Sequence, residues 1–188
     1  LNVQRNVVCE EFKEHYINRP YGDVWHILRK LVYEKHPYQW PTIGLELQHV
    51  QDATLTDVEN FFYKYYRPNN AILTISGGIS ADNALQLAKK WFGDIPSGEP
   101  FNRNIAMEPE QQAAKFQHVK KDVPVNVIYK AWKMPGRIEP LYYATNLLSD
   151  VLGLGESSRL QHALKKETKL FTDIAAYITG SIDTGMFI

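Results

Sequence analysis

The sequence predicts an α+β fold, in which layers of helices cover a mixed or antiparallel sheet. Helical stripes and strand-like apolar runs occur in both halves of the chain. The strand-like runs tend to follow one another, and the helices come in pairs, so a repeated βαβ unit is not the expected arrangement. Hydrophobic residues make up 44% of the 188 residues, which is enough to bury a core and excludes a disordered chain.

The charge and composition exclude several classes of function. The chain has 21 basic and 21 acidic residues, and neither sign forms a long run. A nucleic-acid-binding surface is therefore not expected. No apolar stretch approaches the ~18 residues of a membrane span, and no signal peptide opens the chain. The single Cys9 excludes an internal disulfide and a CxxC metal site, so the compartment, whether cytoplasmic, periplasmic or organellar, stays open.

Both ends of the sequence resemble cut elements. The chain starts at Leu1 within a helical pattern and stops at 185–188, at the start of a strand pattern. We therefore expect this chain to be an internal fragment of a larger parent protein.

The first half of the chain predicts two helices and an irregular loop. Residues 2–17 are expected to be helical, because Val8, Phe12 and Tyr16 recur every four residues without an intervening Gly or Pro. A second helix is expected over 21–34. The loop at 36–41 follows, since two prolines break the pattern there.

A third helix, a strand and a fourth helix are expected next. Thr56 and Glu59 have the spacing of a capping box, and the helix that they open ends at Pro68. The apolar run at 70–76 predicts a strand. Ser80 then caps a helix that ends at Gly93.

The second half follows a polar stretch from Pro96 to Ala114 that contains three prolines. The segment at 97–114 is therefore predicted to be a mobile linker. Periodicity beyond it predicts strands at 116–121, 125–134 and 171–180, and helices at 140–152 and 158–167. Ser157 and Ser158 precede the last helix without a nucleophile motif, so they are interpreted as helix caps.

The first helix carries the most informative polar residues. On a helical projection Gln4, Glu11 and His15 lie within about 40° of one another, whereas Glu10 and Glu14 point elsewhere. A carboxylate flanked by valines is either paired with another group or bound to a cation. A solvated acidic face with a contact between Glu11 and His15 explains the same pattern. The spacing from Glu11 to His15 resembles H-x-x-E-H, but a Glu in the first position rules out a complete zinc site of that type.

The segment from Gln4 to Glu11 resembles the second metal-binding helix of the inverted-zincin peptidases, the pitrilysin and insulinase family. Other motifs of that family follow in the same order along nearly the whole chain: Asn18-Arg-Pro-Tyr-Gly22, His36-Pro-Tyr38, Pro41-Thr-Ile-Gly44, Phe62-Tyr-Lys-Tyr-Tyr66, Pro68-Asn-Asn-Ala71, Trp91-Phe-Gly93 and Gly155-Glu-Ser-Ser-Arg-Leu160.

The resemblance implies a zinc metallopeptidase that hydrolyses peptides or small unfolded polypeptides. It implies that Glu11 is a zinc ligand in the intact parent, and that Gln4 occupies a position around the zinc site where many members have Glu. Gln4 brings no charge, which is a departure from the family. The two His ligands and the general base have no counterpart here, so this chain contributes no catalytic residue of its own. His15, His26, His36 and His49 match no ligand position.

The resemblance also implies a domain organisation and partners. Residues 1–96 would be the C-terminal part of a first, zinc-binding domain, 97–114 a linker, and 115–188 the N-terminal part of a second homologous domain. The implied partners are a peptide substrate, the rest of the parent chain and a second peptidase subunit. Two alternatives remain open: a catalytically inactive partner or structural subunit of the same family, and a peptide-binding module.

Overall fold

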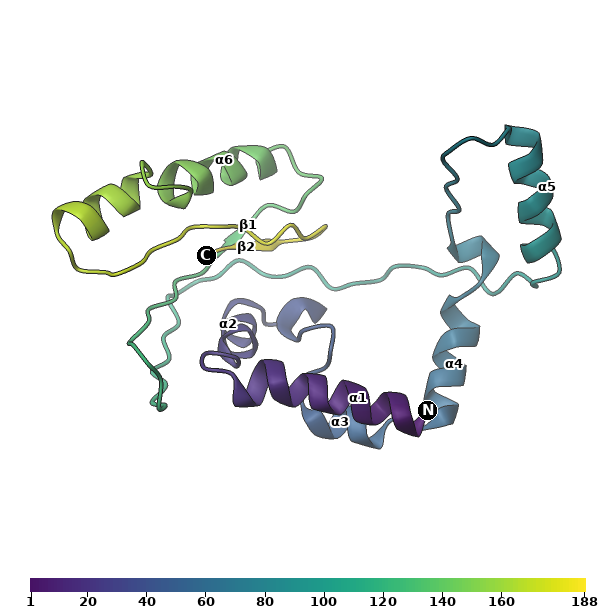
Figure 1. Ribbon diagram of the computed structural model, residues 1–188, viewed down its shortest axis with the longest axis horizontal. Coiled ribbons are helices and arrows are strands. Elements are labelled where there is room, and N and C mark those ends of the chain that lie inside the picture. Colours follow the sequence, from purple (N-terminus) through teal and green to yellow (C-terminus); the bar gives the residue numbers. More distant parts are fainter. The chain divides into compact units, whose positions relative to one another are not determined.

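The computed structural model describes all 188 residues and combines helices with a small antiparallel sheet (Figure 1). This confirms the predicted α+β class. The α-helices are α1 (Asn2–Phe12), α2 (Val24–Val32), α3 (Leu47–Asp52), α4 (Leu55–Tyr65), α5 (Ala81–Phe92) and α6 (Tyr142–Gly153). The strands are β1 (Trp132–Met134) and β2 (Gly185–Phe187). Lys13–Asn18 and Gln161–Glu167 form π-helices, and Pro37–Gln39 and Pro68–Asn70 form single 3₁₀ turns.

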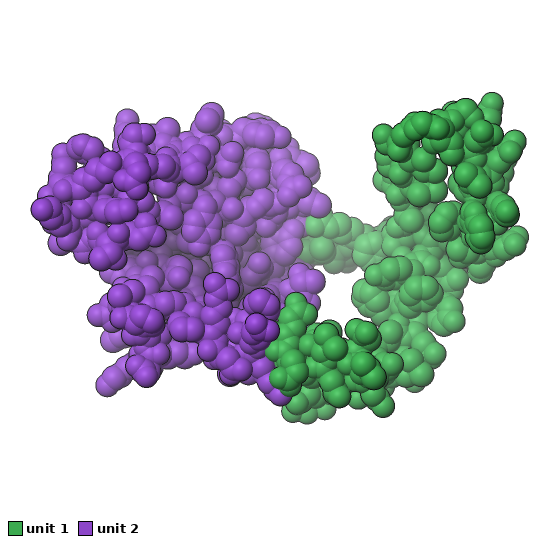
Figure 2. Space-filling view, in the orientation of Figure 1, with its two compact units in different colours: residues 1–12, 46–105 green, residues 13–45, 106–188 purple.

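The chain is divided between two compact units, and each unit is made from two separate stretches (Figure 2). Unit 1 comprises residues 1–12 and 46–105, and unit 2 comprises residues 13–45 and 106–188. The division into 1–96, 97–114 and 115–188 stays a prediction.

Unit 2 contains most of the buried side chains. Its core consists of Val32 and Tyr33, at the end of α2, packed with Met186 and Ile188. Strand β1 pairs with β2 in antiparallel register, with Lys133 opposite Met186. On its other edge β2 continues into a hairpin, in which Tyr177 and Ile188 exchange two backbone hydrogen bonds of 2.9 and 2.8 Å. The C-terminal strand that the sequence predicts is therefore present and central to this core.

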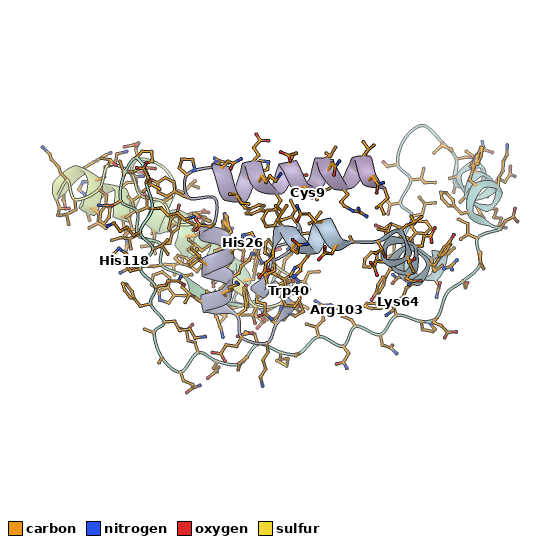
Figure 3. The ribbon with its side chains drawn as sticks, turned by 90° about the horizontal axis from the view of Figure 1, so that it is seen from below. Cys9, His26, Trp40, Lys64, Arg103 and His118 are labelled. Atoms are coloured by element: carbon orange, nitrogen blue, oxygen red, sulfur yellow. The ribbon has the colours of Figure 1, made fainter.

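Unit 1 is organised around the packing of α1 on α3. Cys9 and Phe12 are the buried side chains of α1, and the Arg5 guanidinium donates a hydrogen bond to the carbonyl of Ala53, just after α3. These contacts determine which face of α1 is turned inward. Figure 3 labels Cys9 on this helix.

The start of α4 differs from the sequence prediction. Thr54 Oγ1 accepts a hydrogen bond from Asp57 N at 3.2 Å, and Asp57 Oδ2 accepts one from Thr54 N at 2.9 Å. This capping box replaces the predicted pair of Thr56 and Glu59, because the helix already begins at Leu55. The prediction for α5 is confirmed, since Ser80 Oγ accepts a hydrogen bond from Asn83 N and the helix ends at Gly93.

Most of the predicted strands are only partly formed. Residues 70–76 and 116–121 adopt no strand, 125–134 contribute only β1, and 171–180 contribute only a bridge between Ile178 and Phe187. Strand structure requires a hydrogen-bonded neighbour, and this chain supplies one only around β2. No helix of the structure combines the length and the apolar character that crossing a membrane requires.

The loop before α6 offers a direct test of packing in unit 2. Gly136 is buried, and a Cβ at this position would lie 2.2 Å from the backbone oxygen of Ile182. The backbone there cannot move freely, because the next residue, Arg137, donates its N–H to Ser181 O at 2.8 Å.

We therefore expect Gly136→Ala to lower the free energy of unfolding by about 1–3 kcal/mol. Urea unfolding of the purified protein measures the change. Gly78→Ala is the control, since nothing lies within 4 Å of a Cβ at Gly78. An equal unfolding midpoint for the two variants would contradict the tight packing of the 136 and 182 segments.

Candidate functional site

Glu11 and Gln4, the two residues singled out by the sequence, both lie on α1 and are exposed. They are seven residues apart, or about two turns, and so share one face of the helix. Of the buried residues of α1, Cys9 lies nearly opposite Glu11 and Phe12 lies about 100° from it around the helix. Because those buried residues hold the helix in place, the face with Glu11 and Gln4 is presented outward on a regular scaffold.

The Glu11 carboxylate has no partner within the chain. The Glu11 side chain forms no hydrogen bond or ion pair with another residue, whereas its neighbour Glu10 does interact. The helix changes from α to π at Lys13, and the alignment of His15 with Glu11 stays a prediction. The Glu11 carboxylate is therefore not used in pairing within the chain.

Two histidines of unit 2, His36 and His26, make contacts within the fold. His36 is buried, its Nδ1 accepts a hydrogen bond from Tyr38 N at 3.1 Å, and its Nε2 lies 3.1 Å from Asp183 Oδ2. Since Nδ1 accepts a hydrogen bond, Nε2 carries the ring proton and donates a hydrogen bond to the Asp183 carboxylate. On α2, His26 Nε2 lies 3.2 Å from the carbonyl of Gly44, and Figure 3 labels this residue.

The possible ligand side chains for a metal ion are the His, Cys, Asp and Glu residues of the chain. No group of three or more His, Cys, Asp or Glu side chains is arranged to hold a metal ion. A catalytic zinc site needs three protein ligands and an open position. The carboxylate of Glu11 has the chemistry of one such ligand.

Ser158 does not have the capping role that the sequence predicts. Its Oγ is buried and has no hydrogen-bond partner, so it neither caps the following helix nor contacts a base. Its backbone N–H donates instead to Gly155 O at 3.1 Å, and its carbonyl accepts from His162 N. The segment after it is a π-helix, in which the first turn does not offer the amide geometry of an α-helical cap.

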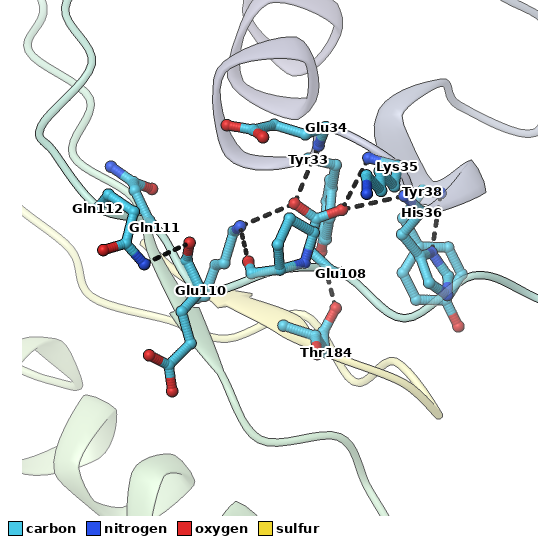
Figure 4. A network of polar contacts seen from close by, with 12 residues as sticks. Tyr33, Glu34, Lys35, His36, Tyr38, Glu108, Glu110, Gln111, Gln112 and Thr184 are labelled. Carbon is cyan, nitrogen blue, oxygen red and sulfur yellow. Dashed lines mark hydrogen bonds and ion pairs between the residues drawn. The ribbon is translucent and has the colours of Figure 1, made fainter.

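A second polar site, centred on Glu108, was not predicted (Figure 4). The Glu108 carboxylate accepts hydrogen bonds from three consecutive backbone amides, those of Glu34, Lys35 and His36, at 2.9, 3.0 and 2.9 Å. The ammonium of Lys133, on β1, lies 2.7 Å from Oε1. Three consecutive backbone amides that point at one anion form an anion-binding turn, called a nest. Here the carboxylate of Glu108 occupies this nest.

The Glu108 carboxylate is strongly stabilised in its charged form. Its side chain has 0% exposed area, and burial alone would raise its pKa. The hydrogen bonds from Lys133 and from the three amides outweigh burial and lower the pKa of Glu108 to about 2. Glu108 therefore remains ionised under all ordinary conditions and fixes the turn after α2 to the segment that precedes β1.

The same turn carries a cluster of rings that closes the core of unit 2. Tyr33 donates its hydroxyl to Thr184 O at 3.0 Å, and the rings of His36 and Tyr38 are 4.1 Å apart between centroids. Burial raises the pKa of Tyr33 to about 12, so the hydroxyl stays a donor. This cluster has no free acid or base and serves the fold.

Comparison with known proteins places this arrangement in a peptidase family. Residues 52–188 match the family described as the peptidase M16 inactive domain. The zinc protease PqqE of Helicobacter pylori is 29% identical over 188 residues, which is 98% of this chain and 42% of that protein. An uncharacterized zinc protease of Bacillus subtilis, YmxG, is 27% identical over 187 residues, or 99% of this chain and 44% of that protein.

A solved structure agrees with these matches. The crystal structure of a protease from Helicobacter pylori superposes with a TM-score of 0.79 and 29% identity, and it covers 99% of this chain and 46% of that chain. The chain thus spans less than half the length of the relatives it matches. It belongs to the peptidase M16 family, of which the pitrilysin-like zinc proteases are members, and the resemblance seen in its motifs is confirmed. Glu11 and Gln4 precede the matched region 52–188.

Proposed function

We propose that this chain is part of a zinc-dependent metalloendopeptidase that hydrolyses peptides or small unfolded polypeptides. In this proposal Glu11 is one zinc ligand and Gln4 lies beside it. The observation that supports the proposal most is the position of the Glu11 carboxylate, which is outward on a packed helix and has no partner in the chain. The names of the zinc proteases that match nearly the whole chain support it further.

The chain's own contribution to catalysis would be to position one anionic ligand. Cys9 and Phe12 hold α1 against α3, so the Glu11 carboxylate is carried on a helix with little freedom to rotate. Gln4 shares this face and can donate a hydrogen bond, but it cannot add the negative charge that a Glu would bring. Two further ligands and the general base would come from outside these 188 residues.

Zinc, when bound, supplies a Lewis acid that polarises a peptide carbonyl and lowers the pKa of a coordinated water. The rest of the parent chain and a partner peptidase subunit would complete the site and enclose a peptide substrate.

The second candidate is a catalytically inactive partner subunit of the same family. The description of the matched family as an inactive domain favours it, and so does the neutral Gln4. The coding sequence that precedes Leu1 discriminates between the two, because an active parent requires an H-x-x-E-H motif there.

The proposed activity is tested on the purified full-length parent. We expect about one bound zinc per chain by metal analysis, and cleavage of quenched fluorescent peptides that stops when a chelator is added. A parent without bound zinc and without chelator-sensitive cleavage would contradict the proposal and favour the inactive subunit.

The isolated 188-residue chain should hydrolyse nothing. It offers one candidate ligand, whereas catalysis requires three ligands and a base. Incubation with quenched peptides and added zinc should give background rates. Chelator-sensitive cleavage that co-purifies with the chain would show that the catalytic residues lie within it.

A further inference from the structure

The hydrogen-bond donors around the Glu108 carboxylate are divided equally between its two oxygens (Figure 4). Oε1 accepts hydrogen bonds from Glu34 N at 2.9 Å and from Lys133 Nζ at 2.7 Å. Oε2 accepts hydrogen bonds from Lys35 N at 3.0 Å and from His36 N at 2.9 Å. This division matches the planar group R–COO⁻. A tetrahedral anion such as sulfate would bring further oxygens after all four donors are used, and a buried acceptor without a donor is costly.

The turn that carries the three amides is held in place by contacts that do not involve Glu108. It follows directly after α2, and the side chains of Tyr33 and His36 are both buried. The Tyr33 hydroxyl donates a hydrogen bond to Thr184 O at 3.0 Å, and His36 Nε2 lies 3.1 Å from Asp183 Oδ2. Both acceptors belong to the C-terminal hairpin. We therefore expect the amides to keep their orientation when the Glu108 side chain is absent.

The fourth donor, Lys133, is fixed by the sheet and by a second acceptor. It lies on β1 in register with Met186, which is fully buried. Its ammonium also donates a hydrogen bond to Pro109 O at 2.6 Å, and its side chain is only 15% exposed. An ammonium that is mostly removed from water requires an anion beside it. The turn and Lys133 therefore form a preformed, positively charged site for one carboxylate.

The Glu108 side chain enters this site from a stretch of chain with little burial of its own. Glu108 and Pro109 are partly buried, whereas residues 99–107 and 110–114 on either side of them are all exposed. A segment that buries so little surface opens locally at a low cost in free energy. A small solute therefore has a route to the amides and to the ammonium of Lys133.

We propose that residues 34–36 and Lys133 form a carboxylate-binding site, in which Glu108 is the resident ligand and which takes a small, unbranched aliphatic carboxylate once that side chain is absent. We call these residues the Glu108 site. Replacement of Glu108 by Ala removes two carbons and two oxygens, and acetate consists of the same four heavy atoms. The C-terminus of a peptide is branched at its α-carbon and does not fit the space of an unbranched side chain. Neither zinc nor Glu11 takes part in this site.

Thermal unfolding of the full-length parent at neutral pH tests the proposal. Excess sodium acetate should raise the midpoint of the transition that Glu108→Ala lowers by at least about 2 °C, relative to sodium chloride of equal ionic strength. Glu110→Ala is the matched control, since Glu110 is exposed in the same segment and its variant reports the general effect of each salt. Acetamide has the shape of acetate without its charge and should have no effect on Glu108→Ala. Sulfate should stabilise Glu108→Ala no more than it stabilises Glu110→Ala.

Glu108→Gln provides a second control, because its side chain fills the site and should prevent acetate from stabilising the protein. Equal effects of acetate on Glu108→Ala and Glu110→Ala would overturn the proposal. An effect of acetamide or sulfate on Glu108→Ala as large as that of acetate would also overturn it. If Glu108→Ala does not fold by itself, its refolding from urea should give at least about twofold more folded protein in acetate than in acetamide. Equal refolding yields would overturn the proposal as well.

Discussion

Glu11→Gln in the full-length parent should remove the bound zinc and lower peptide hydrolysis by at least about a hundredfold, since loss of a residue beside the ligands already costs 10–100-fold. The substitution keeps the shape of the side chain but removes the anionic donor. The carboxylate has no partner within the chain, so the fold of α1 should not change. Metal analysis and initial rates with a quenched peptide measure the two effects.

Two neighbouring carboxylates provide matched controls for Glu11. Glu10→Gln and Glu14→Gln should keep zinc and activity, because neither residue lies on the face that Glu11 shares with Gln4. Circular dichroism of all three variants should be the same. If Glu14→Gln removed the zinc while Glu11→Gln retained it, the assignment of the ligand would be wrong by nearly one turn.

Glu108→Ala should destabilise the protein by about 3–5 kcal/mol, the usual cost of removing one partner from a buried ion pair. The substitution leaves the amides of Glu34, Lys35 and His36 and the ammonium of Lys133 without their anion. Urea unfolding measures the loss. Glu110→Ala is the control, since Glu110 is exposed and its removal should change stability by less than about 0.5 kcal/mol.

The same carboxylate should make the protein sensitive to acid. The pKa of Glu108 is lowered to about 2 in the folded state, from an ordinary value of 4.5. A lowered pKa stabilises the folded state fully above about pH 4.5, and this contribution, on the order of 3 kcal/mol, is lost as the pH falls towards 2. Glu108→Gln should therefore be less stable at neutral pH and show a flatter stability profile between pH 4.5 and 2. Parallel profiles of unfolding free energy against pH, for the unsubstituted protein and for Glu108→Gln, would contradict the role of the nest.

The sequence predicted features that are determined by neighbouring residues. The cap of α5 at Ser80 and its end at Gly93 depend only on local backbone chemistry, and both are confirmed. The capping box of α4 was placed at Thr56 instead of Thr54, because both threonines have an acidic residue three positions later. The spacing alone does not decide between them.

The features that the sequence did not predict depend on distant residues. The apolar run at 70–76 predicts a strand, but strand structure needs a neighbour, and none lies beside it in this chain. Glu108 is an ordinary glutamate in a polar, proline-containing segment; its amide partners lie 72–74 residues earlier, and Lys133 lies 25 residues later. No local pattern identifies such a residue. Glu11 was found through a family motif, and its part in a metal site stays a prediction.

The interleaving of the two units has a consequence for synthesis of the protein on the ribosome. Residues 13–45 form their core with residues 106–188, so the long stretch of unit 1 at 46–105 must be made in between. At ~5–20 residues per second, Val32 and Tyr33 wait roughly 8–30 seconds for Met186 and Ile188 to emerge. During this time an apolar helix is exposed without its partner strand. Nascent chains of this protein should therefore be substrates for chaperones that bind apolar segments, until residue 188 has left the exit tunnel.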